Sequence, residues 1–177
     1  MLDIRTDSHV PADPLTNRKL LHLFYGGPFS QWARSPFVIQ GITYPTAEHW
    51  MMAQKARTFN DHEALVAILD TSDPSRAKAI GRAVRNYDDL TWAQVRYPIV
   101  VHGTLAKFTQ HAESRRYLGL TGLQWIVEAS PTDRIWGIGL DETDERAMDP
   151  ALWRGQNLLG DAIMEVRAAL RTMRQRG

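Results

Sequence analysis

The spacing of apolar and polar residues along the chain predicts a mostly helical protein. We expect five helices, over residues 47–59, 61–69, 74–84, 89–108 and 159–174. Thr46 and Pro74 stand where an N-cap residue and a first-turn proline belong. Pro98 is expected to kink or split the fourth helix, because proline cannot donate the helical hydrogen bond.

Short apolar runs that end at turn-forming residues predict a few strands. These runs cover residues 20–25, 37–40, 41–44, 125–128 and 134–140. The second and third runs meet at Gln40 and Gly41, which suits a hairpin turn. The acidic segment 141–149 is expected to be a solvated loop.

The composition is that of one globular domain. Of 177 residues, 44% are hydrophobic and 23% are charged. Residues 1–18 contain charges and prolines but no apolar leader, so we expect a poorly ordered tail, then a domain over 19–177, in the cytoplasm and without a membrane partner. With 21 basic and 20 acidic residues, any polyanionic partner is expected to be small or locally held. The absence of cysteine excludes disulfides and thiolate metal sites.

The loop 26–36 is a candidate binding loop. Its glycines and prolines disfavour a helix, and it carries Phe29, Ser30 and Arg34. A second interpretation is that Phe29 and Trp32 simply fill the core.

Glu48 and Lys55 form a charged pair on an apolar helix face. They lie seven residues apart, so an α-helix returns them to the same side within roughly 20°, and Met52 shares that side. Charged groups in apolar surroundings are costly and gather at functional sites. Alternatively, Glu48 only favours the positive end of the helix and Lys55 extends its amine into solvent.

The segment 153–160 precedes the last helix and contains Gly155, Gln156 and Asn157. Backbone N–H groups at a helix N-terminus favour anions, so a phosphate is one candidate ligand. The spacing matches neither a P-loop nor a dinucleotide fingerprint, and Asn157 also suits a plain N-cap.

Aromatic residues offer platforms for a flat ligand. In the predicted strand 134–140, Gly137 leaves room beside Trp136, unless the strand packs closely against another backbone. Trp92 begins the long fourth helix and adds a second platform suited to a nucleobase.

Metal and serine chemistry are disfavoured. The six histidines show no zinc-binding spacing, and no Gly-x-Ser-x-Gly motif occurs. His49 faces another side of its helix from Glu48, where it would orient a neighbour or cap a loop. We expect neither a metal nor a cofactor.

Several short motifs occur together in an order typical of one family. They are Tyr44-Pro-Thr-Ala-Glu-His-Trp50, Gly81-Arg82, Leu105-Ala-Lys-Phe108, Glu128-Ala-Ser-Pro131, Trp136-Gly-Ile-Gly139 and Trp153-Arg-Gly-Gln-Asn-Leu-Leu-Gly160. From about Leu20 to Leu170 the chain resembles the NADAR family, which includes riboflavin-intermediate N-glycosidases. The resemblance implies an α+β fold, a single compact, mostly helical domain with a small β-sheet.

The resemblance also implies hydrolysis of a ribose C1′–N bond. Members cleave phosphoribosylamino-pyrimidine intermediates of riboflavin synthesis, and others remove ADP-ribose from guanine bases in nucleic acid. Two positions depart from the family pattern and bear on specificity: Gln31, where Asn is common, and His102, where a Met-containing helix is usual.

Together, the residue patterns and the resemblance predict a set of site residues. The catalytic residues would be Glu48, Lys55 and Asp133. The substrate-binding residues would be Phe29, Ser30, Arg34, His49, Trp92, Trp136, Gly137, Gly155, Gln156 and Asn157.

Breaking a C1′–N bond places positive charge on the sugar and negative charge on the leaving amine. We expect Glu48 to act on the sugar or its attacking water. Lys55 would either set the ionisation of Glu48 and supply a proton, or attack the opened sugar as a Schiff-base nucleophile. Trp92 and Trp136 would sandwich the base, Asp133 would bind the base edge or the ribose, and the 155–157 loop would hold phosphate.

The same residues also suit a non-catalytic module that binds ADP-ribose or an NAD derivative. In either case the expected partner is a small ribosyl-phosphate or ADP-ribosyl compound. The balanced charge favours a free metabolite, whereas the basic residues of the third helix, among them Lys78 and Arg82, would suit ADP-ribosylated nucleic acid. The sequence does not indicate an oligomeric state.

Overall fold

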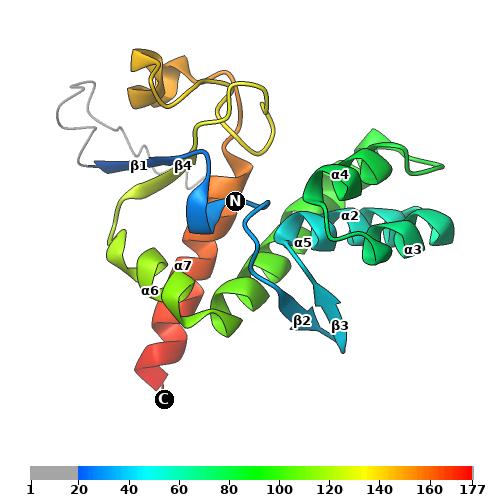
Figure 1. Cartoon of the computed structure of the whole chain (residues 1–177). Helices are drawn as coiled ribbons and strands as arrows, with labels where there is room; N and C mark the ends of the chain where they lie inside the picture. The colour runs from blue at the N-terminus through cyan, green and yellow to red at the C-terminus, as the bar shows by residue number, and fades with distance from the viewer. Residues whose placement is uncertain (1–19, 177) are drawn as a thin grey trace, which may run out of the picture.

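The computed structural model describes residues 20–176, so the predicted tail over 1–18 lies outside the described residues. Helices make up most of the described chain (Figure 1). They are α2 (Ala47–Thr58), α3 (His62–Asp70), α4 (Pro74–Arg82), α5 (Asp89–Gln110), α6 (Ala112–Leu120) and α7 (Leu158–Arg176). The expected fold class, a mostly helical α+β domain with little sheet, is confirmed.

Four helices begin where short polar side chains cap them. Thr46 accepts a hydrogen bond from the backbone N–H of His49 at the start of α2. Aspartates do the same for the next three helices: Asp61 for α3, Asp73 for α4 and Asp88 for α5. Each cap satisfies an N–H group that the helix itself leaves unpaired.

Helix α5 continues through Pro98 as 22 residues, so Pro98 does not split it in two. Its packing against α2 and α7 outweighs the lost hydrogen bond. Helix α6 was not expected. It lacks a side-chain cap and buries only Leu118 fully, so its sequence carries a weak helical signal.

The strands form two small sheets in the described part of the chain. Strand β1 (Leu21–Phe24) pairs in parallel with β4 (Trp125–Glu128). Strands β2 (Phe37–Ile39) and β3 (Ile42–Tyr44) form the predicted hairpin. Its turn residues, Gln40 and Gly41, have φ of 52° and 78°, as a tight hairpin turn requires.

Residues 134–140 are not the predicted strand. They form an irregular loop whose carbonyl groups accept hydrogen bonds from the backbone of 154–159 rather than from another strand. The acidic segment carries one 3-10 helix, η2 (Glu145–Met148), and a second, η3 (Pro150–Leu152), follows it.

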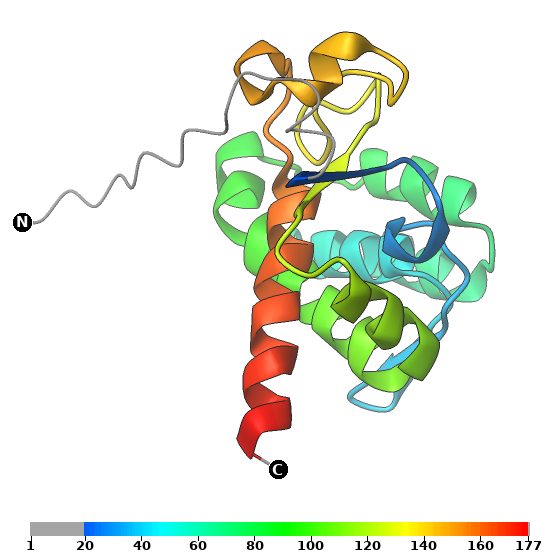
Figure 2. The same ribbon diagram turned by 90° about the vertical axis from the view of Figure 1, so that its left-hand side faces the viewer.

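Helix α2 lies at the centre of a helical group and packs against α3, α4 and α5. Helix α7 packs on α5 and on β4, and Figure 2 shows its first turns beside the small parallel sheet and the rest of the helix extending away from it. The main core fills the space between these elements. None of the helices in residues 20–176 is both long and apolar enough to cross a membrane.

Candidate active site

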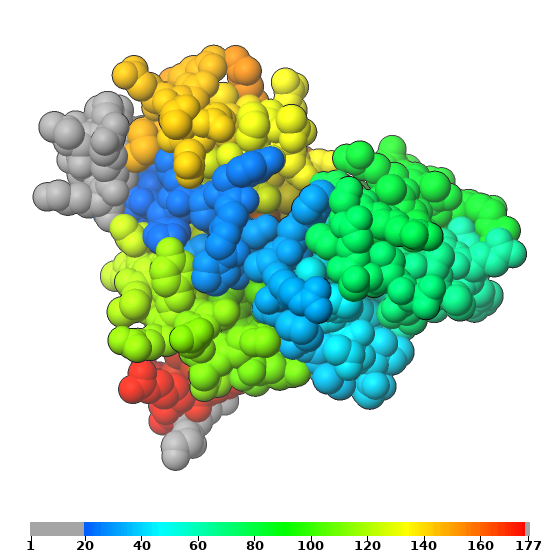
Figure 3. Space-filling view, in the orientation of Figure 1, coloured from blue at the N-terminus to red at the C-terminus, as the bar shows by residue number. Residues whose placement is uncertain are grey.

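A cavity of about 330 Å³ lies where the helical group meets the loop after β4. Figure 3 shows the segments that converge here: residues 20–35 in blue, between the green helical group and residues 130–155 in yellow and orange. The lining residues come from these elements and are Ser30, Gln31, Trp32, Glu48, Met51, Met52, Lys55, Lys78, Arg82, Tyr87, Trp92, Arg96, Glu128, Asp133, Ile135 and Trp136.

Glu48 is a buried carboxylate in the first turn of α2. Its side chain lines the cavity, and Glu48 as a whole is only 2% exposed. The backbone N–H of Glu48 donates to the carbonyl of Gln31, which fixes the loop 26–36 against the helix. Its Oε1 has no hydrogen-bond partner. Burial raises the pKa of Glu48 to about 7, against the opposing effects of Lys78 and of a hydrogen bond from Trp32.

Glu128, the last residue of β4, places a second carboxylate in the same cavity. Its Oε2 is buried and has no hydrogen-bond partner. Burial, with smaller contributions from Asp133 and Glu48, raises the pKa of Glu128 to about 7. Two carboxyl groups that titrate near neutral pH therefore face one cavity, as acid–base catalysis requires. Glu128 was not among the predicted site residues, although it begins the family motif Glu128-Ala-Ser-Pro131.

Lys55 lines the cavity two turns after Glu48 and is buried, so it does not extend into solvent. Its Nζ lies 3.9 Å from the centre of the Tyr87 ring and 5.9 Å from that of Trp92. Burial lowers the pKa of Lys55, opposed by the charge of Asp89. No salt bridge joins Lys55 to Glu48 in the described chain. Lys55 was expected to set the ionisation of Glu48. Instead, Lys78 is the cation whose charge lowers the pKa of Glu48 most.

The two predicted tryptophan platforms, Trp92 and Trp136, both line the cavity. Asp133 also lines it, and its Oδ1 accepts hydrogen bonds of 2.8 Å from the N–H groups of Ile135 and Trp136. The carboxylate of Asp133 thus shapes the turn that presents Trp136.

The loop 26–36 contributes only part of its predicted set. Ser30 lines the cavity, and its carbonyl accepts a 2.9 Å hydrogen bond from Nζ of Lys107, whose burial lowers its pKa to about 7. Phe29 lies in the core against Phe24 and Phe108, as the second interpretation held. For Trp32 that interpretation was wrong, because this residue is 44% exposed and lines the cavity. Arg34 is exposed and does not line the cavity.

His49, in the first turn of α2, is fully buried and does not line the cavity. Its Nδ1 lies 2.8 Å from Oγ1 of Thr46, the capping hydroxyl. Burial lowers the pKa of His49, which favours the neutral ring. The position fits the orienting role that the sequence suggested and not contact with substrate in this cavity.

The loop 153–160 does not line the cavity. The backbone N–H groups of Gln156 and Asn157 donate to carbonyls of Arg134 and Gly137, so they are not free to hold a phosphate. Gly155 serves this close contact, because a Cβ there would lie 2.2 Å from the carbonyl oxygen of Gly137.

Asn157 anchors the end of β4. It has a φ of 56°, and its Oδ1 accepts a 3.0 Å hydrogen bond from the backbone N–H of Glu128. Its Nδ2 donates to the carbonyl of Ile126, also at 3.0 Å. Asn157 therefore positions a cavity carboxylate rather than a ligand.

The positive charge in the cavity comes from residues on separate elements. Lys78 and Arg82 lie one turn apart on α4, and Arg96 reaches in from α5. Nε of Arg96 is buried without a hydrogen-bond partner. The basic residues of the third predicted helix were noted in the sequence as possible ligand contacts. No motif or periodicity around Arg96 or Tyr87 indicated that either residue belongs to the site. Within residues 20–176, no group of three or more His, Asp or Glu side chains could hold a metal ion.

Comparisons with known proteins show which family the chain resembles. A family model of the NADAR domain matches residues 23–171. An N-glycosidase of Acanthamoeba polyphaga mimivirus is 38% identical over 144 residues, which cover 78% of this chain and 85% of that protein. N-glycosidase YbiA of Escherichia coli K12 is 32% identical over 167 residues, 92% of either chain.

The likeness extends to three dimensions. The NMR structure of YbiA from E. coli matches with a TM-score of 0.75 at 30% sequence identity, over 90% of this chain and 89% of that one. The chain therefore belongs to the NADAR domain family and is a hydrolase that acts on N-glycosyl bonds.

Proposed function

We propose that this enzyme hydrolyses the ribose C1′–N bond of a phosphorylated ribosylamine. The first candidate is a phosphoribosylamino-pyrimidine intermediate of riboflavin synthesis, and the second is an ADP-ribosylated guanine base. The observation that carries the proposal is the pair of buried carboxylates, each with an unpartnered oxygen, in a cavity whose lining also includes four aromatic and four cationic side chains. At about 330 Å³ the cavity lies at the small end of ligand sites, which favours the compact metabolite.

The two carboxylates can divide the chemistry between them. In its ionised form, Glu48 takes a proton from the attacking water, whose oxygen bonds to C1′ as the C1′–N bond breaks. In its protonated form, Glu128 donates a proton to the leaving amine. Burial raises the pKa of both carboxyl groups to about 7. Near neutral pH one of them can therefore be ionised while the other is protonated, the state that this division requires.

The remaining lining residues match the rest of such a substrate. Trp92 and Trp136 offer ring faces to the base. Lys78, Arg82 and Arg96 supply the phosphate contacts that the sequence had assigned to the 155–157 loop.

Substrate turnover tests the function. The protein is incubated separately with a phosphoribosylamino-pyrimidine, with DNA carrying ADP-ribosylated guanine and with free ADP-ribose, and released base is measured by mass spectrometry. We expect base release from the pyrimidine conjugate. Tight binding of ADP-ribose without cleavage of either conjugate would instead establish the non-catalytic module.

The route through Lys55 is tested by trapping. Because burial lowers the pKa of Lys55, a larger share of the amine is neutral and able to attack the opened sugar. Direct attack by water, as proposed above, forms no bond to Lys55, so we expect borohydride added during turnover to leave no adduct on it. A reduced sugar adduct on Lys55, located by peptide mass spectrometry and missing from Lys55→Met protein, would instead assign the Schiff-base route.

A further inference from the structure

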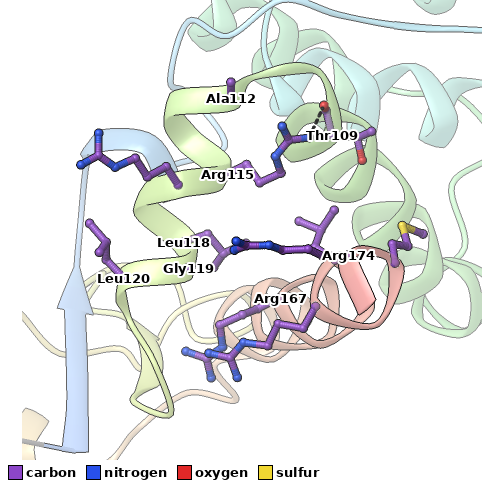
Figure 4. A pocket seen from close by; sticks show the side chains of 12 residues that line it. Thr109, Ala112, Arg115, Leu118, Gly119, Leu120, Arg167 and Arg174 are labelled. Atoms are coloured by element: carbon purple, nitrogen blue, oxygen red, sulfur yellow. Dashed lines mark hydrogen bonds between the residues drawn. The ribbon is translucent and has the colours of Figure 1, made fainter. Parts of the chain in front are cut away.

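A second cavity, of about 870 Å³, opens between α6 and α7. It shares no lining residue with the candidate active site. Five of its twelve lining residues are arginines: Arg115 and Arg116 from α6, and Arg167, Arg171 and Arg174 from α7. Figure 4 shows Arg174 lying across the space between the two helices, beside Leu118. We call this cavity the arginine groove.

The charge of the arginine groove is not balanced locally. The whole chain has a net charge of +1, yet the groove lining contains no acidic residue. Among the described residues, salt bridges involve Arg85 and Arg146 but none of the five groove arginines. Crowded cations without counter-charges destabilise a fold, and a bound anion relieves that cost.

Three of the arginines are held in place by neutral acceptors. Arg167 is buried and donates to Oγ1 of Thr121 at 2.7 Å and to the carbonyl of Gln124 at 2.8 Å. Arg171 donates to the carbonyl of Gly122, and Arg115 donates to that of Thr109. These bonds fix the guanidinium groups without neutralising them, so part of the ordering cost of binding is already met.

The chemistry of the groove favours phosphate on a partly apolar ligand. Every cation in the lining is arginine, whose planar fork binds phosphate in a bidentate manner. Leu118 and Leu170 line the same cavity and Leu120 is largely exposed beside them, so the groove also offers apolar surface. Nucleotides combine both features, because bases stack on guanidinium planes and apolar side chains.

The exposed arginines stand on both walls of the groove. Arg115 and Arg116 lie on α6, and Arg171 and Arg174 lie three residues apart on α7, whereas Arg167 is buried. Four exposed guanidinium groups carry more positive charge than one phosphate neutralises, so a ligand with several phosphates suits the groove better than a single one.

We propose that the arginine groove binds nucleoside phosphates, and binds a single nucleic acid strand more tightly than a mononucleotide. The site is separate from the proposed glycosidase activity, because no residue is common to both cavities. Its failure would leave the proposed function untouched, and the reverse also holds.

Fluorescence anisotropy with a labelled twelve-nucleotide thymidine strand at low salt tests this proposal. Arg116→Glu and Arg174→Glu change exposed residues on opposite walls of the groove. We expect each to weaken strand binding at least about fivefold and to reduce the slope of log K against log salt by about one. Arg146→Glu makes the same charge change outside the groove and is expected to alter the affinity less than about twofold.

Competition identifies the ligand. We expect unlabelled strand to displace the probe more effectively than thymidine monophosphate, and inorganic phosphate to be weakest. Equal displacement by mononucleotide would assign a free nucleotide and overturn the preference for a strand. No binding, binding unaffected by both groove variants, or equal displacement by polyglutamate would overturn the proposal. Thermal unfolding of each variant confirms that the fold is intact.

Discussion

Replacing Glu48 by glutamine is expected to lower the rate of C1′–N hydrolysis by about three orders of magnitude or more. The same change is expected to make the folded protein more stable above pH 7. Glutamine keeps the shape of the side chain but cannot accept the proton of the attacking water, and general-base catalysis alone contributes roughly 10²–10⁴-fold. Loss of the carboxylate also removes the charge that stabilises the developing positive sugar.

The gain in stability follows from the raised pKa of Glu48. Its folded-state pKa is about 7 against an ordinary value of 4.5, so between these values the folded state holds the proton more tightly than the unfolded state. Stability therefore falls as pH rises from about 4.5 to 7, and above this window the buried charge costs up to roughly 3 kcal/mol. Glu48→Gln removes the cost of the buried charge. The gain in stability is reduced by the smaller cost of burying an amide group that lacks a hydrogen-bond partner.

Turnover assays combined with urea unfolding at pH 5 and pH 8 measure both effects. We expect the stability difference between variant and parent to favour the variant more at pH 8 than at pH 5. Glu142→Gln, at an exposed position, is the matched control and should change neither quantity. Turnover by Glu48→Gln close to that of the parent protein would remove Glu48 from the mechanism.

Gly160→Ala is expected to destabilise the fold by roughly 3 kcal/mol or more. A Cβ at Gly160 would lie 2.0 Å from the carbonyl oxygen of Ile126 and 2.5 Å from Nδ2 of Asn157. The contact is with strand backbone, which cannot move aside without separating α7 from β4. The same displacement loosens the anchor on Glu128, so activity should fall together with stability.

Thermal unfolding measures this change, and we expect the Tm to fall by about 6–12 °C. Gly119→Ala in α6 is the matched control, since a Cβ there meets nothing within 4 Å. It should stabilise the protein by roughly 0.5–1 kcal/mol through its better helix propensity. An unchanged Tm for Gly160→Ala would mean that α7 and β4 are not packed this closely.

Helix starts were predictable because capping acts over a few residues. Thr46 and the first-turn Pro74 mark the beginnings of α2 and α4 in the sequence and in the structure. The placement of Glu48 and Lys55 on one side of α2 was also open to sequence reasoning, because helical periodicity fixes it. Both line one cavity, and neither extends freely into solvent.

The glycine-rich segments show where local reasoning fails. Residues 134–140 have the apolar pattern of a strand, and 153–160 has the glycines of an anion-binding loop. In the structure the two segments bond to each other. Carbonyl groups of 134–140 are therefore bonded to the loop 153–160 and not to a strand, and N–H groups of 153–160 are bonded to carbonyls and not to a phosphate. No pattern within either segment reveals that pairing.

By itself, the sequence determined the helices with strong caps, the hairpin, the family and the helix face that carries Glu48 and Lys55. Only the tertiary structure decided that Glu128 would join Glu48, that Lys78 and Arg96 would supply the positive charge, and that Phe29 would remain in the core. The physical reason is range. Periodicity and capping are set by neighbours within one or two turns, whereas burial and electrostatic surroundings are set by residues far apart in the chain.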